Sequence, residues 1–170
     1  MAAILPPNLK ETIAFIFADK DADPIGTGFF LAADKNFLVT ARHVIEGLDK
    51  LYLRINGKKK IKFITVDLDK QPPKYHANPA IDIAVIKIRK QEHMLNRGML
   101  IDDKFQEIVG LYEGDDVFFV GLLPQFYGNL RNTPVVRKGS IALITDEYFE
   151  DEDGSAPYFY IEANCYPGNS

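Results

Sequence analysis

Three polar residues that lie far apart in the sequence, His43, Asp82 and Ser170, carry the side chains used in nucleophilic catalysis. An apolar run precedes His43, and Val44-Ile45-Glu46 before Gly47 predicts a short helical turn with a glycine stop. We therefore expect His43 at a strand end, beside a hydrophobic interior. A histidine held there by packing suits general-base chemistry, because its unperturbed pKa lies nearest to neutral pH. The alternative is a purely structural hydrogen bond at a strand end.

Asp82 lies in the segment Ile81-Asp82-Ile83-Ala84-Val85-Ile86, which predicts a strand over residues 82–88 with the carboxylate at its mouth. A carboxylate among apolar neighbours is costly unless a donor hydrogen-bonds to it. A histidine N–H would be such a donor, so we predict that His43 and Asp82 lie within hydrogen-bond reach. An aspartate that only ends a turn before the strand is the alternative.

Ser170 follows a proline–glycine bend in the segment Tyr166-Pro167-Gly168-Asn169-Ser170. Glycine permits a tight bend, so that successive backbone N–H groups can point to one spot beside the hydroxyl and stabilise an oxyanion. Taken alone, the segment is an ordinary polar turn. Together, however, the three residues occur in the order His, Asp, Ser, which is the chain order of one known catalytic triad.

The elements that must position these residues are short β-strands. In the first half we expect strands at residues 12–18, 26–32, 37–39, 51–55, 61–68 and 82–88, with turns at Asp34-Lys35-Asn36 and Asn56-Gly57. Such spacing, without a long amphipathic helix, is typical of a small antiparallel barrel. In the second half we expect strands at 117–123, 134–145, with a weak point at 138–140, and 158–163, and an acidic solvated loop at 146–154. Three strands do not close a barrel.

These strands predict three regions. An N-terminal β-barrel over residues 1–90 carries His43 and Asp82, a connection covers residues 91–113, and a partial C-terminal β-barrel over residues 114–170 carries Ser170. The fold class is therefore all-β, with two antiparallel barrels of which the second is incomplete.

Composition excludes several other classes of function. The chain has 170 residues and a net charge of −4, so nothing argues for a nucleic acid or membrane partner. Cys165 is the only cysteine, which excludes an intrachain disulfide and suits a reducing compartment. With no secretory signal and no apolar run of about twenty residues, we expect a cytoplasmic protein. No phosphate-cradling glycine loop or metal-ligand pattern occurs, so we expect neither a cofactor nor a metal.

Several segments together resemble the signature blocks of trypsin-like (chymotrypsin-fold) serine proteases, above all the disulfide-free bacterial type that includes the HtrA proteases. They are residues 26–29, Gly-Thr-Gly-Phe; 38–44, Leu-Val-Thr-Ala-Arg-His-Val; 82–87, Asp-Ile-Ala-Val-Ile-Lys; and 167–170, Pro-Gly-Asn-Ser. Residues 114–121 and 139–141 resemble the opening strands of that family's second barrel. The resemblance covers nearly the whole chain and implies two six-stranded-type barrels with the active site between them.

The resemblance also implies an activity, serine endopeptidase action on a polypeptide through an acyl-enzyme intermediate. Ser170 would be the nucleophile, His43 the base, and Asp82 the residue that fixes the histidine tautomer, while the backbone N–H groups of Gly168 and Ser170 would hold the oxyanion. Asn164, Cys165 and Tyr166 would line the near wall of the substrate pocket. Arg42 is a departure, because the family often has a small residue there.

The chain ends at Ser170, where the family continues with Gly-Gly-Pro. A terminal carboxylate there would oppose the oxyanion, so we expect the chain as printed to fold its first barrel and to show no measurable peptidase activity. Two alternatives remain: a protease-like module that binds peptides or regulates a partner without cutting, and a β-barrel adaptor with an accidental triad. The sequence leaves a regulatory partner or a homo-oligomer open.

Overall fold

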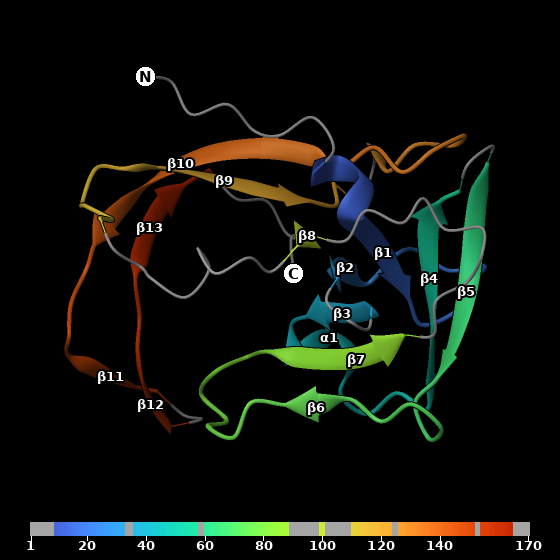
Figure 1. The fold of residues 1–170 in the computed structure, drawn as a ribbon, viewed down its shortest axis with the longest axis horizontal. Helices are drawn as coiled ribbons and strands as arrows, with labels where there is room; N and C mark the ends of the chain where they lie inside the picture. Colours follow the sequence, from blue (N-terminus) through green and yellow to red (C-terminus); the bar gives the residue numbers. More distant parts are fainter. Residues whose placement is uncertain are drawn as a thin grey trace.

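The structure is a computed structural model that describes residues 9–32, 36–57, 60–88, 99–100, 110–123, 126–151 and 154–164. Its ordered elements are nearly all β-strands (Figure 1), as predicted. We call residues 9–100 the first part and residues 110–164 the second part. None of the helices among the described residues is long and apolar enough to cross a membrane.

The first part forms one eight-stranded sheet in the order β5-β4-β1-β2-β3-β7-β6, with β8 paired to β2 off this path. The strands are β1 (Ile13–Phe17), β2 (Gly26–Ala32), β3 (Asn36–Thr40), β4 (Lys50–Asn56), β5 (Ile61–Asp67), β6 (Lys74–Tyr75), β7 (Ala84–Ile88) and β8 (Met99–Leu100), after a 3-10 turn at Leu9–Thr12. The six predicted strands are all present, β2 with the predicted ends and the others with ends shifted by one or two residues, whereas β6 was not predicted. The pairing is not wholly antiparallel as predicted, because β8 runs parallel to β2 and comes from the segment expected to be a connection.

Both predicted hairpins of the first part form, with different turns. In the first, Ala32 pairs with Asn36, so Asn36 belongs to β3 and residues 33–35 of the predicted turn lie outside the described residues. In the second, Asn56 pairs with Ile61 and the Gly57 N–H donates to the Lys60 carbonyl at 3.0 Å. The connection there is longer than the two-residue Asn-Gly turn because Asn56 remains in the strand, where it has a tertiary partner.

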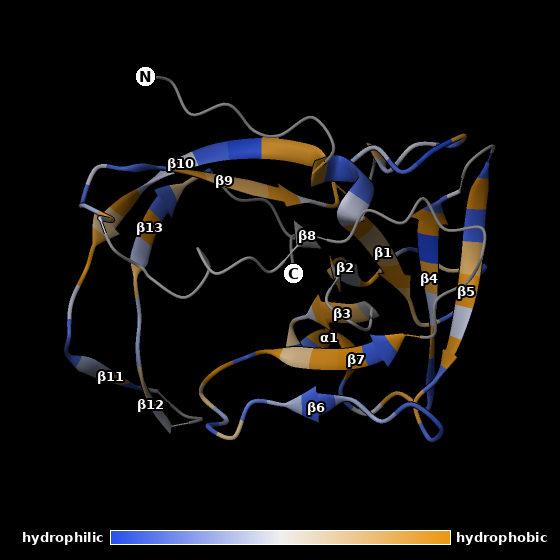
Figure 2. Ribbon diagram, viewed as in Figure 1, coloured by the Kyte–Doolittle hydropathy of each residue, from blue (hydrophilic) through white to orange (hydrophobic). Residues whose placement is uncertain are grey.

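Strand β1 is buried on both faces, which explains its unbroken apolar sequence. Ala14 and Ile16 lie in the main core cluster of the sheet, whereas Ile13, Phe15 and Phe17 pack in a second cluster with Leu122 of the second part. Figure 2 shows the matching run of hydrophobic residues along β1, β3 and β7. Each such buried side chain contributes about 1.5–3 kcal/mol of transfer free energy, so this strand anchors one part on the other.

The second part contains a three-stranded sheet in the order β13-β10-β9 and a separate two-stranded hairpin of β11 and β12. Its strands are β9 (Asp116–Gly121), β10 (Val135–Leu143), β11 (Tyr148–Asp151), β12 (Gly154–Pro157) and β13 (Tyr160–Ala163). The three predicted strands are present. The boundaries predicted for the domains stay a prediction.

Two expectations for the second part were wrong. The acidic segment is not simply a solvated loop: it contributes β11 and the start of β12, held by Phe149 in edge contact with Tyr160 at 5.3 Å and by the buried Ala156. Strand β10 also continues through Lys138-Gly139-Ser140 without a break. A Cβ at Gly139 would stand 2.6 Å from the Glu162 carbonyl oxygen, so glycine is required there by the close approach of β13.

A buried polar link joins β4 to the loop between β9 and β10. Arg54 is only 5% exposed, and its guanidinium donates to the carbonyl oxygens of Tyr127, Gly128 and Asn129. A positive φ of 83° at Gly128 turns this loop back on itself, and a Cβ there would stand 2.2 Å from the Arg131 carbonyl oxygen.

Beside Arg54, Asn56 and Asn132 form a reciprocal pair. The Asn132 N–H donates to Asn56 Oδ1 at 2.8 Å, and Asn56 Nδ2 donates to the Asn132 carbonyl oxygen at 3.2 Å. Asn132 Nδ2 in turn donates to the Arg54 carbonyl oxygen at 2.6 Å. We call these contacts of Arg54, Asn56 and Asn132 the buried link.

Candidate active site

His43 is held by a short helix that directly follows β3, an interior strand of the eight-stranded sheet. Helix α1 (Arg42–Ile45) begins just after β3 ends at Thr40, so His43 is its second residue and not a strand end as predicted. The buried side chains of Val44 and Ile45 anchor the helix in the core. Gly47, with a φ of 78°, follows the helix as expected. Because the apolar residues face inward, the His43 side chain remains 57% exposed.

Asp82 stands in the loop between β6 and β7, two residues before β7 begins. The predicted strand over residues 82–88 is therefore too long at its start. The reason is a tight turn in which the Ile83 N–H donates to the Ile81 carbonyl at 2.8 Å, which takes Asp82 out of the sheet pairing. The alternative interpretation of Asp82, as a turn residue before the strand, describes its local structure correctly.

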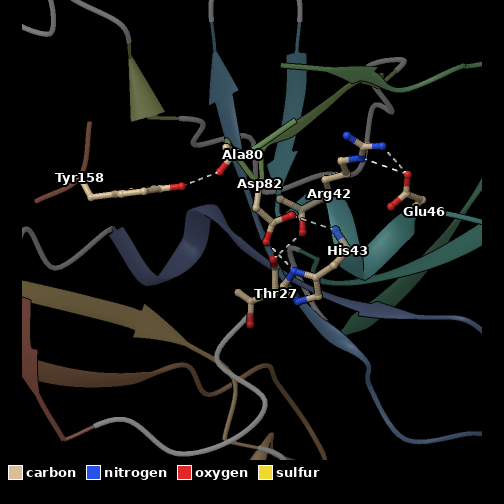
Figure 3. A network of polar contacts seen from close by, with 8 residues as sticks. Thr27, Arg42, His43, Glu46, Ala80, Asp82 and Tyr158 are labelled. Atoms are coloured by element: carbon tan, nitrogen blue, oxygen red, sulfur yellow. Dashed lines mark hydrogen bonds and ion pairs between the residues drawn. The ribbon is translucent and has the colours of Figure 1, made fainter. Parts of the chain in front are cut away.

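The two residues meet because β3 and β7 are antiparallel neighbours. Thr40, the last residue of β3, pairs with Ala84, the first residue of β7. The segment after β3 and the segment before β7 therefore lie at the same end of these two strands. The His43 N–H donates to Asp82 Oδ1 at 2.9 Å, and His43 Nδ1 lies 2.5 Å from Asp82 Oδ2 (Figure 3). The predicted hydrogen-bond reach between His43 and Asp82 is confirmed.

The electrostatics of the pair favour an ionised carboxylate. Burial raises the pKa of Asp82. The hydrogen bonds from the His43 backbone and ring, together with the His43 charge, lower it by more, so the pKa lies below its usual value. An ionised Asp82 holds a proton on Nδ1 of His43. The other ring nitrogen, Nε2, is then an acceptor, which is the form in which histidine can take a proton from a hydroxyl.

Arg42, the departure noted beside His43, points away from the Asp82 contact. Its guanidinium pairs with Glu46 at 2.7 Å, one helical turn along, and lies over the ring of Tyr75 of β6 at 5.1 Å from the centroid. The Arg42 backbone N–H also faces the Asp82 carbonyl oxygen at 3.4 Å. A large residue is tolerated here because its charged end lies beside β6 and not against the imidazole.

Thr27 of the Gly-Thr-Gly segment connects the end of β3, beside His43, to the second part. Its hydroxyl accepts the Leu122 N–H at 3.0 Å, and its carbonyl oxygen accepts the Thr40 hydroxyl at 2.9 Å. Packing favours glycine at position 28 beside it, because a Cβ there would lie 2.8 Å from Cδ1 of the buried Leu38 and 3.0 Å from the Val39 carbonyl oxygen. Sequence reasoning quoted this segment for its resemblance only and gave Thr27 no role; a hydroxyl between two glycines was the available signal.

Four of the predicted site residues, Cys165, Tyr166, Gly168 and Ser170, lie outside the described residues. Asn164, predicted for the substrate pocket, is exposed at the end of β13. It lines a hollow of about 450 Å³ with Lys138, Gly139, Ser140, Glu162 and Ala163. Across the described ranges, no three His, Cys, Asp or Glu side chains gather in a way that could hold a metal ion. The catalytic roles assigned to the triad stay predictions.

Two residues that sequence reasoning missed join the loop that carries Asp82 to the second part. Asn78 Nδ2 donates to the Ser155 carbonyl oxygen at 2.7 Å, and the Tyr158 hydroxyl donates to the Ala80 carbonyl oxygen at 3.1 Å. Nothing in the sequence pairs a proline-rich loop with a tyrosine so far along the chain. An Asn-Pro turn was the only local signal.

Comparison with known proteins also indicates a peptidase domain. Residues 26–170 match the trypsin-like peptidase domain. No curated protein sequence matches the chain significantly. The MamO protease domain from Magnetospirillum magneticum is similar in structure, with a TM-score of 0.64 and 16% identity over 93% of this chain and 74% of that one.

Two further solved structures share the fold. The HtrA-type protease AlgW with a decapeptide has a TM-score of 0.58 and 17% identity over 96% of this chain and 51% of that one. Rv3671c from M. tuberculosis H37Rv, in the inactive form of a serine-to-alanine mutant, has a TM-score of 0.59 and 14% identity over 99% of this chain and 78% of that one. The chain thus spans about half the length of the AlgW chain. The predicted fold class, a trypsin-like double β-barrel, is confirmed.

Proposed function

We propose, since this chain belongs to the family of trypsin-like peptidase domains, that it is a serine endopeptidase. The observation that carries the proposal is the His43–Asp82 contact, with Nδ1 and Oδ2 at 2.5 Å and the backbone N–H on Oδ1 at 2.9 Å. Two bonds from one residue to both carboxylate oxygens fix the orientation of the imidazole. They also leave Nε2 for a nucleophile.

In the proposed reaction, Ser170 Oγ attacks the carbonyl carbon of the substrate while its proton passes to Nε2 of His43. Asp82 stabilises the imidazolium that forms. The backbone N–H groups of Gly168 and Ser170 donate to the oxyanion. Cleavage of the C–N bond returns the proton from His43 to the leaving amine, and water then hydrolyses the acyl-enzyme by the same route.

We assign a polypeptide as the substrate class. AlgW, which shares the fold, was solved with a decapeptide, and this supports peptide binding by the present chain. Asn164 and the hollow beside it are the part of the predicted substrate pocket that the described residues include. The cytoplasmic location stays a prediction.

The test compares the full-length protein with Ser170→Ala and His43→Ala in a fluorogenic casein assay and in fluorophosphonate labelling. We expect each variant to lose peptide hydrolysis by roughly three to six orders of magnitude, because triad members act as a unit. His93→Ala is the matched control, since no role is assigned to that histidine. Hydrolysis by Ser170→Ala at the parental rate would show the proposal to be wrong; peptide binding without cleavage by the parent would favour the non-cleaving module.

A further inference from the structure

The second part is hydrogen-bonded to the first part at the loop that carries Asp82. Ser155 of β12 accepts the Asn78 side-chain N–H at 2.7 Å through its carbonyl oxygen. Tyr158, just beyond β12, donates its hydroxyl to the Ala80 carbonyl oxygen at 3.1 Å, and Figure 3 shows this bond beside the His43–Asp82 pair. We call these two bonds the clamp.

Hydrogen bonds inside the loop connect the clamp to Asp82. Asn78 Oδ1 accepts the Ala80 N–H at 3.1 Å, and the Asn78 carbonyl oxygen accepts the Ile81 N–H at 3.1 Å. The Ile81 carbonyl oxygen in turn accepts the Ile83 N–H at 2.8 Å. Residues 78–83 therefore form a chain of short-range bonds with Asp82 inside it, so a shift of Asn78 or Ala80 also shifts Asp82.

Burial does little to fix Asp82. Its side chain is 49% exposed, Ile83 after it is 44% exposed, and pairing with the sheet begins only at Ala84. A loop with little buried surface is held mainly by its hydrogen bonds. One side of this loop bonds to α1 through His43 and Arg42, and the other side bonds to the second part through the clamp.

We propose that Asn78 and Tyr158 are positioning residues, which let the β11–β12 hairpin set how firmly Asp82 holds His43. The inference rests on the proposed function, in which that contact orients the general base. Neither residue touches the reacting atoms. A displacement of about 1 Å in a catalytic group can cost roughly a hundredfold in rate.

The test uses Tyr158→Phe, which removes one hydroxyl and keeps the ring, and Asn78→Asp, which keeps the acceptor for the Ala80 N–H and removes the donor to Ser155. We expect kcat for a fluorogenic peptide to fall about tenfold in each variant with KM unchanged, a fraction of the loss that a 1 Å misplacement causes. We also expect the proton NMR signal of the His43 Nδ1–H to move upfield, since a longer bond to Asp82 deshields that proton less.

Two controls separate positioning from general loosening. Asn56→Ala removes the reciprocal pair with Asn132 in the buried link, which joins the same two parts away from the Asp82 loop. It should lower thermal stability without moving the His43 signal. Tyr148→Phe removes a hydroxyl from the β11–β12 hairpin at a residue that is 67% exposed. It should change neither kcat nor the His43 Nδ1–H signal.

A double-variant measurement tests the route through Asp82. In an Asp82→Asn background, Tyr158→Phe should cause no further loss in labelling rate, because the contact that it positions is already gone. An equal loss in both backgrounds, or an unmoved Nδ1–H signal in folded Tyr158→Phe, would overturn the inference. If the parent neither cleaves nor labels, the proposed function fails by itself, and the NMR signal alone then decides whether the clamp positions Asp82.

Discussion

The buried link at Arg54 and the His43–Asp82 pair use similar hydrogen bonds in opposite surroundings. Arg54 is 5% exposed and Asn132 is 4% exposed, whereas the side chains of His43 and Asp82 are 57% and 49% exposed. Arg54 donates to backbone carbonyls and lies over the ring of Tyr127 at 5.1 Å. The pair instead joins two side chains that can both exchange protons.

This difference separates a group that stabilises the fold from a pair that we propose to be catalytic. Burial lowers the pKa of Arg54 and the interaction with Tyr127 raises it by less, so the pKa lies below its usual value, but the guanidinium remains charged at neutral pH. Its loss would leave partly buried carbonyl oxygens without their donor, which is costly. Breaking the exposed pair lets water replace the lost bonds, so the folded state loses little while the chemistry loses its orientation.

Among the variants that test this comparison, the largest effect should come from Asp82→Asn in the full-length protein. We expect peptide hydrolysis to fall about 10⁴-fold, as it does in the serine proteases for which this triad was worked out. The free energy of unfolding should change by less than about 1 kcal/mol, because the pair is exposed. Steady-state kinetics and urea denaturation measure the two quantities. An unfolding change larger than that of an Arg54 variant would reverse the comparison.

Arg54→Met should show the reverse pattern. It keeps the apolar length of the side chain but leaves the carbonyls of Tyr127, Gly128 and Asn129 without their donor, so we expect a loss of about 2–4 kcal/mol in unfolding free energy. Hydrolysis by the folded protein, measured well below its unfolding temperature, should stay within about twofold of the parent. A tenfold drop in kcat in the fully folded variant would mean that the buried link also serves the site.

Lowering the pH should weaken the Asp82 contribution to stability. Because the folded-state pKa of Asp82 lies below its usual value, its contribution to stability is fully present above that usual value and is lost as the pH falls through the folded-state pKa. The difference in unfolding free energy between parent and Asp82→Asn should therefore shrink below about pH 4. Denaturation of both proteins at pH 6 and at pH 3 measures it; a difference that grows on acidification contradicts the assignment.

The smallest effect should come from Glu46→Gln. It removes the charge opposite Arg42 in an exposed i,i+4 pair, worth about 0.3–0.5 kcal/mol. Arg42 keeps its place over the Tyr75 ring, so kcat should be unchanged within error. Thermal denaturation in low and in high salt checks it, since salt should reduce the difference between variant and parent. A large fall in kcat would place Arg42 in the machinery of the site.

The sequence by itself determined six of the eight strands of the first part and the pairing of His43 with Asp82. Apolar runs such as Ile13–Phe17 form strands because their side chains must be buried, and that requirement is local to each run. The order of His43, Asp82 and Ser170 and the segments around them were also readable, because each lies in a short motif. The His43–Asp82 contact was predicted from the cost of a carboxylate among apolar residues, although in the structure the Asp82 side chain is 49% exposed.

Only the tertiary structure decided which distant groups support that contact. The acidic hairpin of β11 and β12, the parallel pairing of β8, and the clamp of Asn78 and Tyr158 depend on partners far along the chain. Nothing in the sequence distinguished Arg54 from other arginines in strands. Its role depends on the loop at Gly128, which directs three carbonyl oxygens toward its guanidinium. Polar residues of this kind carry no periodic signal, because their position is fixed by hydrogen bonds to a partner and not by their own burial.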